Sequence, residues 1–256
     1  MALIAMSSSA KSMSTLPQNN KNNGGTESAG RMFKLDQRLT TVYGFIRDGR
    51  VFADIGTDHA YLPCYAVLNG KSPSAFACDV KDGPLLHAAA TVKNYKLVDI
   101  ISFVISYGLM YMDDLQFDDI VIAGMGGELI CDIIRLSPYL KDPKYNFVLQ
   151  PMLSKDKLRE FLLTNGFNII NDVYCVSQGR FYSVINAVYD GVTRTLTPFQ
   201  ALMGVWDRGM PPRFSKEYAL RQVHVLKKRI AGIKSAGKEC PSDEALLEEV
   251  KEFIRS

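Results

Sequence analysis

The sequence ADIGTDHAYLP, from Ala53 to Pro63, joins a short hydrophobic run to a pattern of helical spacing. A turn of this kind, between a strand and a helix, is where α/β proteins bind nucleotide cofactors, because a glycine lets the ligand approach the backbone closely. Nucleotide-binding turns usually contain three glycines. This turn contains Gly56 alone, and Asp58 and His59 stand where further glycines are expected. The stretch therefore predicts a ligand-binding turn in which a carboxylate and an imidazole have tasks of their own.

On both sides of this turn, short apolar runs alternate with helical segments. Apolar strands that are each followed by a helix indicate a parallel sheet with helices on both faces. The last two runs flank Ser177-Gln178-Gly179-Arg180 and predict an antiparallel hairpin, the ending that is typical of class I methyltransferases. We expect strands over residues 51–54, 74–79, 100–106, 120–123, 147–149, 169–176 and 181–189, and helices over residues 33–46, 61–69, 128–136 and 154–163, with another after Pro84.

The composition changes beyond Gly191 and predicts two helices, over residues 213–238 and 242–254, joined as a hairpin. The first helix is rich in Lys and Arg and contains one acid, Glu217, whereas the second is acidic. Two interpretations are open. The opposite charges hold the helices together, or the basic side chains contact the phosphate backbone of a nucleic acid, which requires cations in number but in no fixed arrangement.

The chain has 256 residues, of which 47% are hydrophobic, and a net charge of +3. This length suits one sizeable domain with a small appendage. We assign residues 32–190 to a methyltransferase domain and residues 191–256 to a helical hairpin domain. Residues 1–31 are rich in Ser, Asn and Gly and predict a disordered tail. An organelle transit peptide is the alternative for this tail, although Arg is absent before Arg31.

Two further features bear on the environment of the protein. No run is apolar for long enough to span a membrane. The five cysteines form no CxxC pair, which disfavours a zinc site and indicates reduced thiols. We expect a cytoplasmic monomer without a membrane partner.

Unusual residues end three of the predicted strands. The second strand ends at Asp79, roughly twenty residues beyond Gly56, where an acid accepts hydrogen bonds from ribose hydroxyls; the alternative is that Asp79 caps the next helix. The fourth strand ends in the glycine-rich IAGMGG of residues 122–127, and the fifth ends in Gln150-Pro151. Open parallel sheets bind ligands at the carboxyl ends of their strands, so we expect these residues to form one site.

Taken together, these motifs resemble the TrmK family, bacterial tRNA (adenine-N1)-methyltransferases that act on the adenine at nucleotide 22. The resemblance rests on ADIGTDHAYLPCYAVLNG at residues 53–70, Asp82-Gly83-Pro84, IAGMGG, and the LQP of residues 149–151, with Leu35, Arg38 and Leu39 in the entering helix. It covers residues 34–190 motif by motif and the C-terminal helices in character only. It implies an α/β fold of class I, Rossmann-like, that binds S-adenosylmethionine, and a C-terminal α-helical hairpin that helps to hold tRNA.

The same resemblance implies roles for individual residues. Methyl transfer would take place beside Asp58, His59, Gln150 and Pro151. The cofactor would be bound by Asp54, Gly56, Asp58, Asp79, Tyr107, Gly108, Gly124, Met125 and Gly126. The tRNA would be contacted by Arg38, Lys227, Lys228, Arg229 and Lys234. No metal ion is expected.

Methyl transfer from a sulfonium cation would explain why the turn carries Asp58 and His59. Adenine N1 already has a lone pair, so positioning supplies much of the acceleration and no strong base is needed. The methylated base is a cation that a nearby carboxylate stabilises, and an imidazole can stack or exchange a proton. The target base has to leave its stack to reach the site. A helix-start histidine bonded to the backbone is the alternative for His59, and we assign His87 and His224 to structural or solvated positions.

Three positions depart from the family pattern. Ser106-Tyr107-Gly108-Leu109 replaces G-D-G-L and so lacks the acid that usually accepts the amino group of the cofactor's adenine. Met152 replaces the asparagine of LQPN, and Ser183 replaces a glutamate. These changes keep a second hypothesis open, a degenerate family member that binds RNA or a protein partner without methyl transfer. A nicotinamide-dependent oxidoreductase is disfavoured by the lone Gly56 and by the closing hairpin.

Overall fold

The computed structural model describes residues 33–206 and 210–256, and residues Leu35–Ser256 form one compact unit. The predicted disordered tail, residues 1–31, lies outside the described residues. Among the helices of the described ranges, none combines the length and the hydrophobicity that a membrane span requires. All five cysteines are free and buried.

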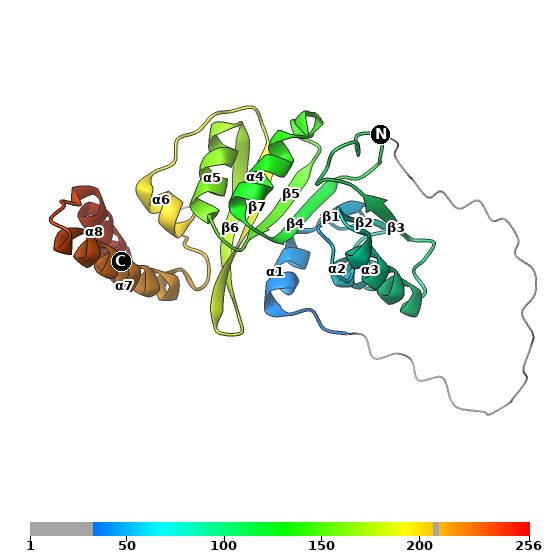
Figure 1. Cartoon of the computed structure of the whole chain (residues 1–256), viewed down its shortest axis with the longest axis horizontal. Coiled ribbons are helices and arrows are strands. Elements are labelled where there is room, and N and C mark those ends of the chain that lie inside the picture. Colours follow the sequence, from blue (N-terminus) through cyan, green and yellow to red (C-terminus); the bar gives the residue numbers. More distant parts are fainter. Residues whose placement is uncertain (1–32, 207–209) are drawn as a thin grey trace, which may run out of the picture. The chain divides into compact units, whose positions relative to one another are not determined.

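A seven-stranded sheet forms the centre of the fold, in the order β3-β2-β1-β4-β5-β7-β6 (Figure 1). The neighbours among β1 to β5 pair in parallel, whereas β7 is antiparallel to both β5 and β6. The predicted class I methyltransferase architecture, with its closing antiparallel hairpin, is therefore confirmed. The strands are β1 Phe52–Ile55, β2 Ala75–Asp79, β3 Ile101–Ile105, β4 Asp119–Met125, β5 Asn146–Pro151, β6 Phe167–Ser177 and β7 Arg180–Tyr189.

Helices pack on both faces of the sheet. The helices are α1 Gln37–Phe45, α2 Tyr61–Leu68, α3 Asp82–Asn94, α4 Gly127–Arg135, α5 Lys155–Thr164, α6 Pro198–Met203, α7 Ser215–Ser235 and α8 Pro241–Arg255. The last three do not cover the faces of the sheet; they form a core cluster of their own beside β6 and β7. Phe52 and Val121 belong to the core cluster formed with α1 and α2, whereas Ile55 and Ile122 belong to the cluster formed with α4 and α5. Side chains alternate between the faces along a strand, so Asp54 shares the face of Phe52 and meets α1.

Strand β4 runs two residues beyond its predicted end at Ala123. A shift in register between Ala123 and Met125 lets the strand continue, and Met125 pairs with Pro151. Gly124 occupies this bulge with a φ of 84°, in the left-handed region that favours glycine. The glycine-rich segment therefore bends within the sheet, as well as turning into α4.

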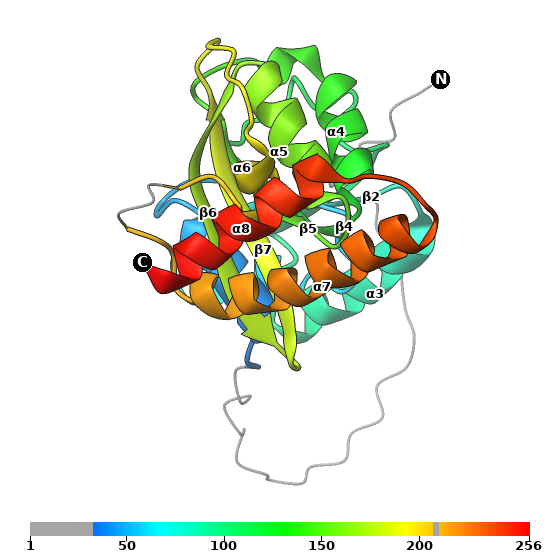
Figure 2. The same cartoon turned by 90° about the vertical axis from the view of Figure 1, so that its left-hand side faces the viewer.

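The C-terminal region forms the predicted helical hairpin of α7 and α8, which lie side by side (Figure 2). Arg229 donates to both carboxylate oxygens of Asp243, and Lys234 pairs with Glu244. These pairs confirm that opposite charges contribute to holding the two helices together.

Helix α6 was absent from our predictions, although its sequence carries a recognisable start. Thr197 accepts a hydrogen bond from the backbone N–H of Gln200 at 3.1 Å, and the Gln200 side chain accepts one from the backbone of Thr197 at 3.0 Å. This reciprocal capping box, followed by Pro198, is a start signal for a helix. The helix has only six residues, too few to show helical periodicity.

A buried ion pair joins four elements of the fold. The Arg159 side chain, 0% exposed, donates from Nε to Asp172 at 2.6 Å and from Nη1 to the Ala201 carbonyl at 2.8 Å. Its Nη2 donates to the Ser183 hydroxyl at 3.1 Å, and Ser183 in turn donates to Asp172 at 2.8 Å. Ser183, one of the departures from the family pattern, is thus a hydrogen-bonded member of a network in which Asp172 supplies the carboxylate.

Replacing Arg159 by Met is expected to lower the free energy of unfolding by about 3–5 kcal/mol, because Asp172 would remain buried without its counter-charge. Urea denaturation measures this loss. The control is Arg135→Met, which removes a half-exposed pair with Asp132 and should cost less than about 1 kcal/mol. Equal losses in the two variants would contradict the assignment.

Candidate active site

The carboxyl ends of β1, β2, β4 and β5 bring the sequence motifs together at one edge of the sheet. Parallel pairing places Ile55 beside Cys78, and the backbone N–H groups of Gly56 and Thr57 both donate to the Cys78 carbonyl, at 2.8 and 2.9 Å. On the other side of β1, Met125 pairs with Pro151. The turn, Asp79, the glycine-rich bulge and Gln150-Pro151 are thus neighbours through strand register.

A cavity of about 90 Å³ lies at the ends of β1, β2 and β4. Ten residues line it: Ile55, Gly56, Asp79, Val80, Ser106, Tyr107, Gly108, Met125, Leu129 and Ile133. Five of the predicted cofactor residues are among them, and these are Gly56, Asp79, Tyr107, Gly108 and Met125. The structure therefore gathers these five into one pocket.

Met125 explains why this cavity is small compared with the roughly 300–1,000 Å³ of typical ligand pockets. Gly56 has a φ of 77°, and a Cβ at this position would lie 2.2 Å from the Met125 methyl group. The thioether side chain therefore covers the backbone of the turn. Methionine is flexible and readily repacks, so a change in its side-chain conformation would widen the pocket over Gly56.

Asp79 lies at the rim of the cavity, and its two carboxylate oxygens are in different situations. Oδ1 accepts a hydrogen bond from the Lys81 backbone at 2.9 Å, just before α3 begins. Within the described part of the chain, Oδ2 has no hydrogen-bond donor. The Asp79 side chain does not cap α3, whose N-cap residue is Lys81, and its role toward ribose hydroxyls stays a prediction.

Asp54 is an acid that the fold keeps out of water. Its side chain is 8% exposed, and burial raises its pKa to about 6, against smaller lowering effects of the Thr57 hydroxyl and the Arg38 guanidinium. A buried carboxyl group with a raised pKa, at the end of a central strand, has the character of a functional group. It would gain most from a cationic ligand, which would favour its ionised form.

Arg38 lies at the same edge of the sheet. Its Nη1 donates to the Gln150 side-chain oxygen at 2.8 Å, and the Gly124 backbone donates to the same oxygen at 3.1 Å. We predicted a tRNA contact for this arginine, and its position beside Gln150 and Gly124 puts it within the site. Arg38 and Gln150 are 112 residues apart in the chain, so no local sequence pattern predicts their contact.

Gln150 and Pro151 are both buried, and Gln150 is 0% exposed. The Gln150 amide nitrogen donates to the Pro151 carbonyl at 3.0 Å and to the Met152 sulfur at 3.6 Å. The Met152 thioether therefore acts as an acceptor at the position of the family's asparagine. All polar atoms of Gln150 are used inside the protein, so this residue can act on a substrate only through the groups that it holds.

Asp58 and His59 lie on the open side of the turn, with side chains that are 72% and 40% exposed. Their closest oxygen and nitrogen, Oδ2 and Nε2, are 3.3 Å apart. The His59 ring stacks on Tyr61 and on His87, with ring centroids 5.2 and 5.3 Å away. His87, which we assigned to a structural or solvated position, is therefore a neighbour of the site. Asp58, His59 and His87 each offer a ligand atom within 4.8 Å of the others, and so could hold a metal ion.

The predicted tRNA contacts of α7 are all exposed but differ in their surroundings. Arg229 and Lys234 pair with acids of α8, as described above. Lys227 and Lys228 have no ion-pair partner in the ranges that the structure describes. Among the described residues, none of these four lines the strand-end pocket.

Comparison with known proteins was made by sequence and by structure. Residues 35–185 match the family described as methyltransferase domain. The tRNA (adenine(22)-N(1))-methyltransferase of Bacillus subtilis (strain 168) is 40% identical over 167 residues, which are 62% of this chain and 70% of that protein. The crystal structure of the B. subtilis M1A22 tRNA methyltransferase TrmK matches with a TM-score of 0.71 and 30% identity, over 87% of this chain and 96% of that chain.

A Streptococcus pneumoniae protein, whose crystal structure is a complex with S-adenosyl-L-methionine, matches with a TM-score of 0.74 and 26% identity. This match covers 85% of this chain and 98% of that chain. Sequence identity over most of a curated relative and structural likeness over the methyltransferase fold and the C-terminal helices point the same way. The chain belongs to the TrmK family of class I methyltransferases.

Proposed function

We propose that the protein transfers a methyl group from S-adenosylmethionine to N1 of adenine 22 in tRNA. One observation carries this proposal. The motifs shared with the family converge on one edge of the sheet, where a pocket is lined by Gly56, Asp79, Tyr107 and Met125, and the buried Asp54 lies at the end of β1, one residue before the lining residue Ile55. The names of the relatives identify adenine 22 as the methylated nucleotide, and the site contains groups suited to a cationic nucleoside cofactor.

The residues present fit this cofactor. Asp79 offers an acceptor for ribose hydroxyls, and the Tyr107 side chain, 53% exposed at the pocket wall, offers a ring face for a base. The buried Asp54 carboxyl suits the positive charge of the methionine part. When bound, the cofactor supplies an electrophilic methyl group. The aromatic face at Tyr107 would take the place of the acid that this chain lacks.

Asp58 is proposed to stabilise the positive charge that adenine acquires on methylation. It is exposed at the open side of the turn, where an incoming base could approach, and His59 beside it could stack on that base. Gln150 is a positioning residue in this proposal, since it holds Arg38 and the Gly124 backbone. No proton has to leave adenine N1, so we propose methyl transfer without a metal ion and expect activity to persist in EDTA.

Incubation of unmodified tRNA with labelled cofactor, followed by mapping of the modified base, tests the proposal directly. Methyl label at N1 of adenine 22 is the expected result. The alternative of a degenerate, RNA-binding family member predicts no label and no cofactor binding by calorimetry at millimolar concentration. We also retain a monomeric state, a cytoplasmic location and the division into domains 32–190 and 191–256 as parts of this proposal.

Arg38→Met is expected to shift the pH dependence of cofactor binding. The Arg38 guanidinium lowers the pKa of Asp54, so its removal should raise the pH at which affinity is half-maximal. Calorimetry between pH 5 and pH 8 measures the shift. Arg50→Met is the control, because Arg50 is exposed and pairs with Asp118, away from the site. A loss of tRNA affinity with an unchanged pH profile would assign Arg38 to RNA binding alone.

A further inference from the structure

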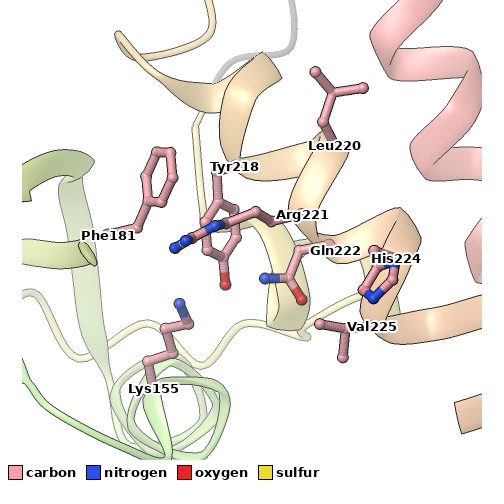
Figure 3. Close-up of a pocket in the computed structure, with 8 residues that line it drawn as sticks. All are labelled: Lys155, Phe181, Tyr218, Leu220, Arg221, Gln222, His224 and Val225. Carbon is pink, nitrogen blue, oxygen red and sulfur yellow. The ribbon is translucent and has the colours of Figure 1, made fainter. Parts of the chain in front are cut away.

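A second cavity, of about 580 Å³, lies between the start of α5, strand β7 and the first half of α7 (Figure 3). Its polar and aromatic lining consists of Lys155, Phe181, Tyr218, Arg221, Gln222 and His224. None of the residues that line it is acidic. The cavity therefore presents cations and rings without a carboxylate among the side chains around it.

Two cations face this space, and each lies over an aromatic ring. The Lys155 ammonium is 4.2 Å from the centroid of Tyr218, and the Arg221 guanidinium is 5.1 Å from that of Phe181. Figure 3 shows the Lys155 amine, the Tyr218 hydroxyl and the Arg221 guanidinium pointing into the same space. Neither cation has an ion pair with a carboxylate in residues 33–206 or 210–256.

Lys155 is partly buried without a carboxylate in ion-pair contact among the described residues, although Asp172 and Asp156 act on it from further away. Burial, and then the neighbouring Arg159, lower its pKa to about 8. The Asp172 carboxylate is already paired with Arg159 in the buried ion pair of the core. An anion in the cavity would raise the pKa of Lys155 again, because an opposite charge at short range favours the ammonium.

The cavity is linked to the active site by a short segment. Lys155 follows Gln150-Pro151 by only a few residues, and the segment between them exposes Met152 and Leu153, whose side chains are 45% and 74% exposed. A polymer with its target base at the strand ends could therefore cross this segment and reach Lys155. Cations that contact a backbone next to aromatic rings are typical of sites for unpaired nucleic acid.

We propose that this cavity binds a backbone phosphate of the tRNA substrate, close to the nucleotide that is methylated. Lys155 and Arg221 contact the phosphate oxygens, the Tyr218 hydroxyl donates to them, and the ring of Phe181 supports the Arg221 guanidinium. This inference rests on the proposed function, because it takes tRNA to be the polymer. It assigns the main tRNA contact of α7 to the side facing the methyltransferase fold, whereas Arg229 and Lys234 are engaged with α8.

The test uses Lys155→Gln and Arg221→Gln in the full chain, with tRNA affinity measured over a series of salt concentrations. Each variant should bind tRNA at least tenfold more weakly and reduce the slope of log affinity against log salt by about 1, as expected for one lost phosphate contact. Affinity for S-adenosylmethionine should be unchanged, which also shows that the variants are folded. Lys157→Gln is the matched control, because Lys157 lies on the same helix, is 61% exposed and pairs with Glu128.

Wild-type tRNA affinity and salt slope in both cavity variants would overturn the proposal. So would equal losses in the Lys157 control, which would indicate a general effect of charge. Competition with inorganic phosphate and with adenosine monophosphate forms a separate arm. If either binds in the cavity at micromolar concentration without weakening tRNA binding, the cavity is a small-molecule site and the proposal is wrong. Wild-type protein that binds tRNA without methylating it would refute the proposed function but would leave the salt-slope test of this cavity intact.

Discussion

Asparagine in place of Asp54 is expected to weaken S-adenosylmethionine binding strongly and, at the same time, to make the free protein more stable above pH 6. Both effects follow from the burial of this carboxyl group, whose pKa is raised from 3.8 to about 6. A shift of this size corresponds to roughly 3 kcal/mol between the two protonation states. The ionised carboxylate therefore opposes folding in the absence of a ligand, and it becomes favourable when a cation lies beside it.

The pH dependence has a definite sign. Between pH 3.8 and about 6, the folded protein binds more protons at Asp54 than the unfolded chain does. Stability therefore falls as the pH rises through this window, and the full cost is present above pH 6. The Asp54→Asn variant has no such cost, so its gain in the free energy of unfolding should be about 1–3 kcal/mol at pH 7.5 and vanish near pH 3.5. Urea denaturation at the two pH values measures the difference.

Cofactor affinity should change in the opposite direction. We expect Asp54→Asn to lose at least about 100-fold in affinity at pH 8, because a buried charge-assisted contact is removed. For the wild type, affinity should weaken by about tenfold per unit below pH 6, as Asp54 takes up a proton. Calorimetry gives both quantities.

Asp119→Asn is the matched control for the change in stability. Asp119 is also buried, at the other end of the neighbouring strand, but it accepts hydrogen bonds from the Arg47 backbone at 2.7 Å, Arg47 Nε at 2.6 Å and Asn146 at 3.0 Å. Its conversion to Asn should therefore destabilise the protein. A loss of stability in Asp54→Asn comparable to that in Asp119→Asn would show that Asp54 is a structural acid.

Asp58→Ala is expected to reduce the rate of methylation by at least about 100-fold while the protein stays folded. The carboxylate is 72% exposed, so its removal leaves no cavity and no unpaired buried group. Loss of a charge that stabilises the methylated base affects the transition state more than the bound substrates. The rate constant of a single turnover should therefore fall further than the affinity for tRNA or cofactor.

Asp48→Ala serves as its control, because Asp48 is another exposed acid, 87% accessible, in the turn before β1, where it pairs with Lys71. This variant should methylate tRNA at the wild-type rate, with an unchanged melting temperature. Full activity in Asp58→Ala would remove the carboxylate from the mechanism. Partial activity in Asp58→Asn would separate its hydrogen bonding from its charge.

The sequence predicted the architecture because hydrophobic patterning reports local burial. Apolar runs that alternate with helical segments require a parallel sheet, and the run around Ser177-Gln178-Gly179-Arg180 requires a hairpin. The position of the pocket was predictable for the same reason, since parallel strands share one carboxyl edge. The errors were local. Helix α6 is too short to show helical periodicity. Strand β4 continues through a bulge at Gly124, where the glycine-rich sequence led us to predict that the strand ends in a turn.

What the patterning could not reveal is which side chains meet across the fold. The contact of Arg38 with Gln150, the stack of His59 on His87, and the cavity that joins Lys155 to Tyr218 all connect elements far apart in the chain. Periodicity identifies the buried face of an element without identifying its partner, because every apolar face favours burial against any other. Partners are chosen when the whole chain packs, and polar side chains such as these then acquire surroundings that no local window of sequence contains.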